Sequence, residues 1–232
     1  MLAELKRRVC EANRRLPGLG LAPLNFGNAS GIDRERGILG IKPSGVDYAG
    51  LRPADIVLVD LGGKVVEGRL RPSTDTPTHV ELYRAFPAIG GIVHTHSPHA
   101  TAFAQAGRAI PALGTTHADF FDGPVPVTRT LRASELKGTY ERDTARAVTE
   151  LLAALKADPL HLPAALVRHH APFVWGVSLD KAVENAVALE FCARCAWLTL
   201  ALEPRAKPLP EGLRRRHFYR KHGAAAYYGQ PL

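Results

Sequence analysis

Long apolar runs and cysteines are scarce in this sequence of 232 residues, and both shortages limit what the protein can be. The most apolar stretch, residues 182–202, is interrupted by Glu184, Glu190 and Arg194, so we expect no membrane-spanning helix of about 18 apolar residues. The first residues also lack the apolar core of a signal peptide. Three cysteines cannot form an even disulfide framework, which is typical of a reducing compartment. We therefore expect a cytoplasmic protein without a membrane partner.

Two of the cysteines, Cys192 and Cys195, form a Cys-x-x-Cys pair. Redox and zinc sites of this spacing usually lie at a helix start, whereas this pair lies inside a long helical pattern. Buried small side chains are therefore the favoured interpretation.

The formal net charge of +8 permits an acidic partner, and residues 214–216 and 220–221 form a basic cluster near the end of the chain. The cluster permits nucleic-acid binding, but no aromatic stacking motif, helix-turn-helix or zinc-finger spacing accompanies it. A solvated basic face, or a site for a small phosphorylated ligand, explains the cluster better than nucleic acid does.

Strand-like and helix-like segments follow one another without an internal repeat or a linker, which predicts one α/β domain over residues 1–232. Residues 25–31 indicate a turn, and residues 114–121 indicate a strand-to-loop junction. We expect helices at 2–16, 78–86, 98–106, 143–157, 179–202 and 209–221, with Ser178 as the cap of the long one, and strands at 38–41, 56–59, 64–67, 90–97 and 164–167.

The most informative stretch is residues 90–97, an apolar run that ends in His94 and His96. Residues two apart on a strand project to the same face, so the two imidazoles should lie close together. Such a pair alone is equally typical of hydrogen-bonded histidines at a strand end. A second apolar strand ends in His169 and His170, and two such ends side by side in a sheet would place three imidazoles around one point. Three ligands and an open position are what a catalytic zinc requires.

Loops of small and polar residues could hold a substrate. Residues 25–31 and 42–45 combine glycines with hydroxyl groups and a lysine, and glycines let backbone N–H groups approach a ligand. Ser73, Thr74 and Asp75 precede a helix whose N-terminus could bind an anion. From spacing alone we favour capping of that helix over contact with a ligand.

Five segments together resemble the class II sugar-phosphate aldolase and epimerase family. The resemblance covers nearly the whole chain, and it implies a three-layer α/β/α fold with a mixed, mostly antiparallel central sheet. It also implies a homotetramer with active sites between subunits. The segments are IKPSGVDY (41–48), STDTPTH (73–79), GGIVHTHSPH (90–99), GTTHADF (114–120) and RKHGAAAYYGQ (220–230).

The resemblance also implies roles for particular residues. Asp119 and Tyr228 would be the acid/base groups, with the tyrosine reaching in from the neighbouring subunit. Manganese or cobalt could replace zinc, since imidazole and carboxylate accept them too. The implied zinc ligands are His94, His96 and His170, with Asp75 as a further ligand or near neighbour, and the implied substrate and phosphate cradle is Gly27, Asn28, Ser44, Gly45, Ser73 and Thr74.

The implied activity is the interconversion of L-ribulose 5-phosphate and D-xylulose 5-phosphate in L-arabinose use, by cleavage and re-formation of the bond between carbons 3 and 4. Asp75 favours this reaction, since the aldolases of the family carry glutamate there. The family usually shows His-x-His-Gly-Pro-Phe where this chain has Arg168 and Ala171 at the first and fourth places. The alternatives are a class II aldolase or an epimerase for another sugar phosphate, and a non-catalytic binding module on the same fold.

Overall fold

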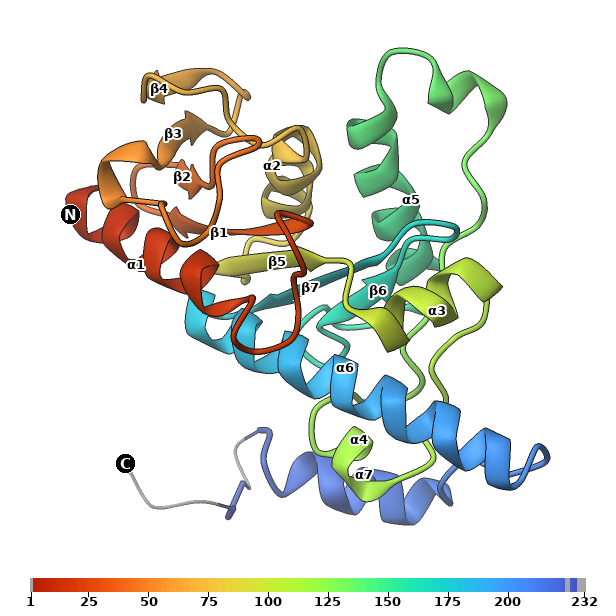
Figure 1. Cartoon of the computed structure of the whole chain (residues 1–232). Coiled ribbons are helices and arrows are strands. Elements are labelled where there is room, and N and C mark those ends of the chain that lie inside the picture. Colours follow the sequence, from red (N-terminus) through yellow and green to blue (C-terminus); the bar gives the residue numbers. More distant parts are fainter. Residues whose placement is uncertain (1, 224–225, 229–232) are drawn as a thin grey trace.

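A central sheet organises the computed structural model, which describes residues 2–223 and 226–228 (Figure 1). Its seven described strands lie in the order β4-β3-β2-β1-β5-β7-β6, and each neighbouring pair is antiparallel. This confirms the expected sheet. The strands are β1 (Gly27–Asp33), β2 (Ile38–Ile41), β3 (Val57–Asp60), β4 (Val65–Glu67), β5 (Gly91–Thr95), β6 (Ala164–Leu166) and β7 (Pro172–Gly176).

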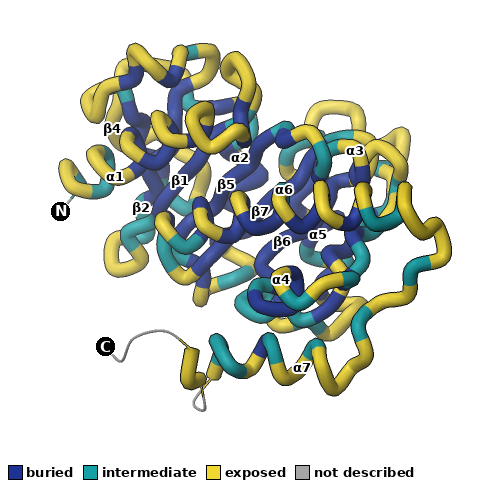
Figure 2. Tube along the Cα trace, turned by 60° about the horizontal axis from the view of Figure 1, so that its bottom comes forward, coloured by how far each residue is buried: buried dark blue, intermediate teal, exposed yellow. Residues whose placement is uncertain are grey.

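Helices cover both faces of the sheet, which gives the three layers that the resemblance implies (Figure 1). Because side chains alternate along a strand, Val93 of β5 packs with α1, α3 and α6, whereas Ile92 packs with α2 and α5. In Figure 2 the central strands β1, β5 and β7 are buried, whereas many residues of the surrounding helices are exposed. The helices are α1 (Leu2–Arg15), α2 (Thr76–Ala85), α3 (Pro98–Ala106), α4 (Thr115–Ala118), α5 (Tyr140–Leu155), α6 (Leu179–Leu202) and α7 (Glu211–Tyr219), with 3-10 turns at Pro53–Asp55 and Ala133–Leu136.

Helix α6 has the bounds that the sequence predicts, and the Ser178 side chain accepts a hydrogen bond from the backbone N–H of Lys181, as a cap should. Its start lies so close to β5 that a Cβ on Gly91 would come within 2.4 Å of the Leu179 Cα. By length and composition α6 is also apolar enough to cross a membrane, contrary to our expectation for this stretch. Core helices pass the same test, and α6 buries ten residues in this fold.

Three segments differ from the sequence-based prediction. Residues 27–33 form the strand β1 instead of a turn, because pairing with both β2 and β5 outweighs the low strand propensity of glycine and asparagine. Residues 115–118 form the short helix α4. Strand β7 was not predicted; it begins at Pro172, a position that proline tolerates because the first residue of a strand can lack a donor.

The Cys-x-x-Cys prediction is half right. Cys192 is buried, and burial raises the pKa of its thiol to about 12, whereas Cys195 is exposed. The cysteines Cys10, Cys192 and Cys195 are all free. Cys192 is therefore a small core side chain, and Cys195 lies on the surface of α6.

Candidate active site

Three histidines converge at one end of the sheet. His94 lies in β5, His96 follows its last residue, and His170 lies in the loop between β6 and β7. Their ring centroids are 4.9 to 5.2 Å apart, and one ligand atom from each lies within 4.8 Å of the others. The expected place was two neighbouring strand ends, but β7 separates β5 from β6. His170 reaches the site because the loop after β6 turns back into β7, which pairs with β5.

Neighbouring groups fix the rings of His94 and His170. His94 donates from Nδ1 to the carbonyl oxygen of Pro172 at 2.9 Å, since a carbonyl can only accept. Its ring also stacks on Phe173, with centroids 4.1 Å apart. The Nδ1 atom of His170 lies 3.3 Å from the hydroxyl of Tyr140. Hydrogen bonds of this kind leave Nε2 available, as in the outer shell of known metal sites.

The electrostatic environment favours neutral imidazoles. Burial, together with the neighbouring histidines, lowers the pKa of His170 to about 4 and lowers the pKa of His96 from its ordinary value. Metal ions bind the neutral form of histidine, so the lone pairs of these rings are available at neutral pH. Three imidazoles with ligand atoms this close fit a divalent metal of the zinc type.

The histidines open into a polar pocket of about 400 Å³. The structure brings all six residues of the implied substrate cradle into the lining of this pocket. Gly27 permits a close approach there, because its φ is 129° and a Cβ would lie 2.5 Å from the carbonyl oxygen of His94. The lining consists of Asn25, Gly27, Asn28, Lys42, Pro43, Ser44, Gly45, Ser73, Thr74, Asp75, His94, His96 and His170.

Asp75 lies at the N-terminus of α2 but makes no capping hydrogen bond with its side chain, so our preference for capping was wrong for this residue. Its Oδ2 instead accepts hydrogen bonds from Asn28 Nδ2 at 2.7 Å and from Ser73 Oγ at 3.4 Å. Burial opposes ionisation, but His94 and the amide of Asn28 hold the pKa of Asp75 below its ordinary value. A carboxylate thus lines the pocket of the histidines, and its contact with a metal stays a prediction.

Two residues near the histidines carried no role from the sequence: Lys42, which lines the pocket, and Tyr140, which lies beside His170. Lys42 is almost fully buried, with its Nζ 3.3 Å from the carbonyl oxygen of Pro43 and 4.9 Å from the ring centroid of Tyr48. Burial lowers the pKa of its ammonium group. The other residue is Tyr140, the hydroxyl beside His170. The sequence indicated Lys42 indirectly, because the loop 42–45 combines a cation with a hydroxyl and a glycine. It gives no signal for Tyr140, which lies 30 residues from its partner His170.

The acid/base candidates Asp119 and Tyr228 form a separate cluster. Asp119 follows α4 and accepts hydrogen bonds from Arg220 at 2.7 and 3.0 Å and from His217 Nδ1 at 3.1 Å, with Lys221 at 3.4 Å. The Arg220 and Lys221 cations also lie 4.7 and 4.4 Å from the ring centroid of Tyr228. Burial opposes ionisation of Asp119, but these partners hold its pKa below the ordinary value.

This acid/base cluster is apart from the three histidines within one chain. Neither Asp119 nor Tyr228 lines the histidine pocket, and α4 and α7 lie together at the lower edge of Figure 1, away from the end of β5. The basic cluster is also less solvated than we expected, since Arg214 pairs with Asp122, and Arg220 and Lys221 pair with Asp119. Part of the implied terminal motif, residues 224–225 and 229–230, lies outside the described residues.

Comparisons with known proteins show the family of this chain. The model of the class II aldolase and adducin N-terminal domain matches residues 7–197. The L-ribulose-5-phosphate 4-epimerase UlaF of Salmonella paratyphi B (strain ATCC BAA-1250 / SPB7) is 52% identical over 229 residues, which are 99% of this chain and 100% of that protein.

Solved structures share the fold. An L-fuculose 1-phosphate aldolase matches with a TM-score of 0.78 and 25% identity, over 92% of this chain and 94% of its own. The L-fuculose-1-phosphate aldolase of Thermus thermophilus matches with a TM-score of 0.69 and 24% identity, over 88% and 99% of the two chains, which shows a common fold.

Proposed function

Because the chain belongs to the class II aldolase and adducin family, we propose that it is a metal-dependent epimerase that interconverts L-ribulose 5-phosphate and D-xylulose 5-phosphate. The observation that carries the proposal is the group of three histidines, whose ligand atoms lie within 4.8 Å of one another in a pocket lined by glycines, hydroxyls and a lysine. The 52% identity to the UlaF epimerase supports the choice of substrate. The same comparison supports a role in carbohydrate catabolism, which we propose to be L-arabinose use.

We propose zinc as the metal, with His94, His96 and His170 as its ligands. Zinc accepts three imidazoles and leaves a position open for a substrate. When bound, the metal would act as a Lewis acid that draws charge from the oxygens of the ketose. Asp75 stands close by, with one oxygen held by Asn28, and either contributes a fourth ligand or orients the ring of a histidine. Manganese and cobalt are alternatives, because they accept the same donors.

The stereochemistry of the substrate demands cleavage of a carbon–carbon bond. The hydrogen on carbon 4 of a 2-ketopentose is not adjacent to the carbonyl at carbon 2, so simple deprotonation cannot invert this centre. A base instead removes the proton of the 4-hydroxyl, the bond between carbons 3 and 4 breaks, and its electron pair passes to the three-carbon fragment, which becomes the enediolate of dihydroxyacetone. The aldehyde fragment, glycolaldehyde phosphate, rotates, carbon 3 of the enediolate attacks its other face, and an acid returns a proton to the new 4-alkoxide. Two acid/base groups on opposite sides of the fragment are therefore needed.

The phosphate must remain bound while the aldehyde fragment is free to rotate. The ammonium of Lys42 and the hydroxyls of Ser44 and Ser73 line one pocket. Gly45 also lines it, with a φ of 70° that favours glycine, so its backbone faces the pocket without a side chain. Charged and hydroxyl donors of this kind bind phosphate oxygens. They hold the fragment inside the pocket, so the enzyme releases an epimer rather than two cleaved products.

We propose that the two acid/base groups are Asp119 and Tyr228 in a homotetramer, with the tyrosine reaching in from a neighbouring subunit as the resemblance implies. Because Asp119 lies in the same cluster as Tyr228, we propose that it comes from that subunit too. Within one chain both lie in the acid/base cluster, away from the histidines, and Tyr228 is 59% exposed. A neighbouring copy could therefore present the two groups together to the histidine pocket. We also propose a cytoplasmic location, which agrees with the three free cysteines.

The proposal is tested by comparing the wild-type protein with His94→Asn and with the matched control His169→Asn. His169 is exposed and has a φ of 62°, which asparagine tolerates. We expect His94→Asn to lose bound zinc and at least about 10³-fold in turnover, because one of three ligands is gone. The control should keep both. Metal content is measured by atomic emission, and the product is identified from L-ribulose 5-phosphate by NMR.

The products separate the proposal from its alternatives. D-xylulose 5-phosphate supports an epimerase, whereas accumulation of glycolaldehyde phosphate and dihydroxyacetone would identify an aldolase. Zinc binding without turnover of this substrate would leave a binding module or an enzyme for another sugar phosphate. Full activity of a zinc-free His94→Asn protein would refute a metal-dependent reaction.

A further inference from the structure

Among the three histidines, His96 alone has no hydrogen bond to either ring nitrogen from any residue that the structure describes. His94 and His170 are held through Nδ1 by Pro172 and Tyr140. The His96 ring has only ring contacts, with Phe26 at 6.3 Å and with the other two histidines. Its position therefore depends on its backbone, which joins the end of β5 to the start of α3.

The start of α3 is held by a carboxylate from another helix. Glu190, in the middle of α6, accepts hydrogen bonds from the backbone N–H groups of His99 and Ala100 at 2.9 and 3.0 Å. It also binds His99 Nδ1 at 2.7 Å. The first N–H groups of a helix have no partner inside the helix, and a negative charge there is favourable. Ser97 occupies the usual capping position but makes no capping bond with its side chain, so Glu190 supplies that function.

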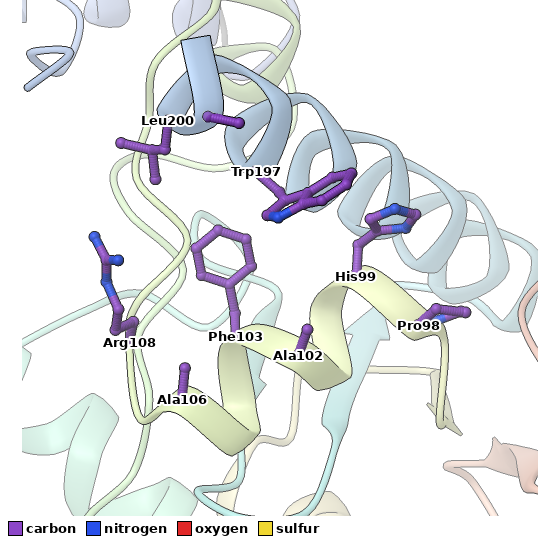
Figure 3. A pocket seen from close by; sticks show the side chains of 9 residues that line it. Pro98, His99, Ala102, Phe103, Ala106, Arg108, Trp197 and Leu200 are labelled. Carbon is purple, nitrogen blue, oxygen red and sulfur yellow. The ribbon is translucent and has the colours of Figure 1, made fainter. Parts of the chain in front are cut away.

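Helix α6 is itself fixed to the sheet that carries the histidines. Asn185, five residues before Glu190, donates to the carbonyl oxygen of Trp175 in β7 at 2.9 Å. On the other side of Glu190, Trp197 lies beside His99, with ring centroids 5.7 Å apart. Figure 3 shows these two side chains meeting across the groove between α3 and α6. Glu190 thus holds the first turn of α3 to helix α6, which lies outside the β5–α3 connection that carries His96.

We propose that Glu190 is a positioning residue for the metal ligand His96. Only Ser97 and Pro98 separate His96 from the residue whose N–H group Glu190 binds. By holding that residue, the carboxylate sets where the His96 imidazole stands relative to the other two. The side chain of Glu190 is 16% exposed, so water replaces it poorly when it is removed. This role rests on the proposed metal site. It extends the set of residues that support that site to helix α6, outside the sheet.

The test compares Glu190→Ala with Glu184→Ala, a matched change on the same helix. Glu184 is 56% exposed and pairs only with Lys181 in a surface ion pair among the described residues. Zinc affinity is measured by competition with a chromophoric chelator on folded protein. We expect Glu190→Ala to bind zinc about 10-fold more weakly, the lower end of the effect of losing a group that holds a ligand directly, because Glu190 acts on His96 through the backbone. The control should bind zinc as the wild type does.

Two further variants separate positioning from a general loss of structure. Glu190→Gln keeps one acceptor oxygen but presents an N–H₂ group to a backbone N–H, so it should weaken zinc binding to an intermediate degree. His99→Ala keeps both backbone N–H groups, so its zinc affinity should stay within about threefold of the wild type. If Glu190→Ala does not fold, the zinc affinities of Glu190→Gln and His99→Ala still test the positioning role. Urea unfolding of the metal-free proteins measures the stability of each variant.

The outcomes are distinct. Unchanged zinc affinity in the folded Glu190 variants, with or without a loss of stability, would overturn the role of Glu190 and leave the proposed function intact. A wild-type protein that binds no zinc, or binds it as tightly after His94→Asn, would overturn the proposed function and this role with it.

Discussion

His117 is buried and neutral, and its replacement by glutamine should make the protein less sensitive to acid. The residue is 3% exposed, and its Nε2 donates to the carbonyl oxygen of Gly123 at 2.7 Å. Its Nδ1 has no hydrogen bond among the described residues. Burial lowers the pKa of His117 to about 4, although the bond to Gly123 favours the charged form. Glutamine can place an N–H group where Nε2 stands, and it does not titrate.

The size of the effect follows from linkage. The pKa of an unfolded histidine is about 6.5, so between pH 7 and pH 5 the unfolded chain binds a proton that the folded chain does not. Stability is therefore full above the unfolded pKa and is lost as the pH falls towards the folded value. For one such group the loss between pH 7 and pH 5 is about 2 kcal/mol. In a chain of this size that corresponds to a fall in Tm of roughly 4–8 °C.

The assay is urea unfolding at pH 7 and at pH 5, with a chelator present so that metal release does not contribute. We expect the wild type to lose about 2 kcal/mol more than His117→Gln over this interval. His169→Asn, which changes an exposed histidine, should lose as much as the wild type. An equal acid loss in His117→Gln and in the wild type would show that His117 takes up its proton without unfolding, which would refute the reasoning.

Two further predictions concern the reaction. Tyr228→Phe should keep its zinc and slow epimerisation by about 10²-fold or more, because it removes only an acid/base hydroxyl; a normal rate with Phe would exclude the tyrosine from proton transfer. Lys42→Met keeps the unbranched shape of a buried pocket side chain but removes its charged end, so kcat/KM for the sugar phosphate should fall by about 10-fold or more. Zinc content should stay normal in this variant, and an unchanged kcat/KM would show that the phosphate lies elsewhere.

The strongly periodic parts of the fold could be predicted from the sequence. Helix α6 was predicted with its bounds and its Ser178 cap, because its helical pattern is long and its start carries a typical capping residue. Strand β1 could not be predicted, because Gly27, Asn28 and Ser30 become a central strand only through partners on both sides. The short helix α4 has too few residues for a helical period to show.

The candidate site was predictable only where local geometry along the chain determines it. His94 and His96 share a strand face by local geometry alone, whereas the choice of His170 over His169 came from the family resemblance. Lys42 enters the pocket lining, and Tyr140 reaches His170, only through the tertiary fold. The separation of Asp119 from the histidines depends on the packing of α4 and α7, which no spacing in the sequence encodes.

The division between the histidine pocket and the acid/base cluster has a consequence for how such a protein could change its chemistry. The pocket lies at one end of the sheet, on strand residues and on the loops beside them, while Asp119 and Tyr228 belong to a peripheral unit of α4, α7 and the described residues after α7. On the proposed roles of Asp119 and Tyr228, mutations in the peripheral unit would alter which protons move while the proposed cation site and phosphate anchor keep their residues. The fold thereby allows evolution to exchange one transformation for another while the core keeps its sequence.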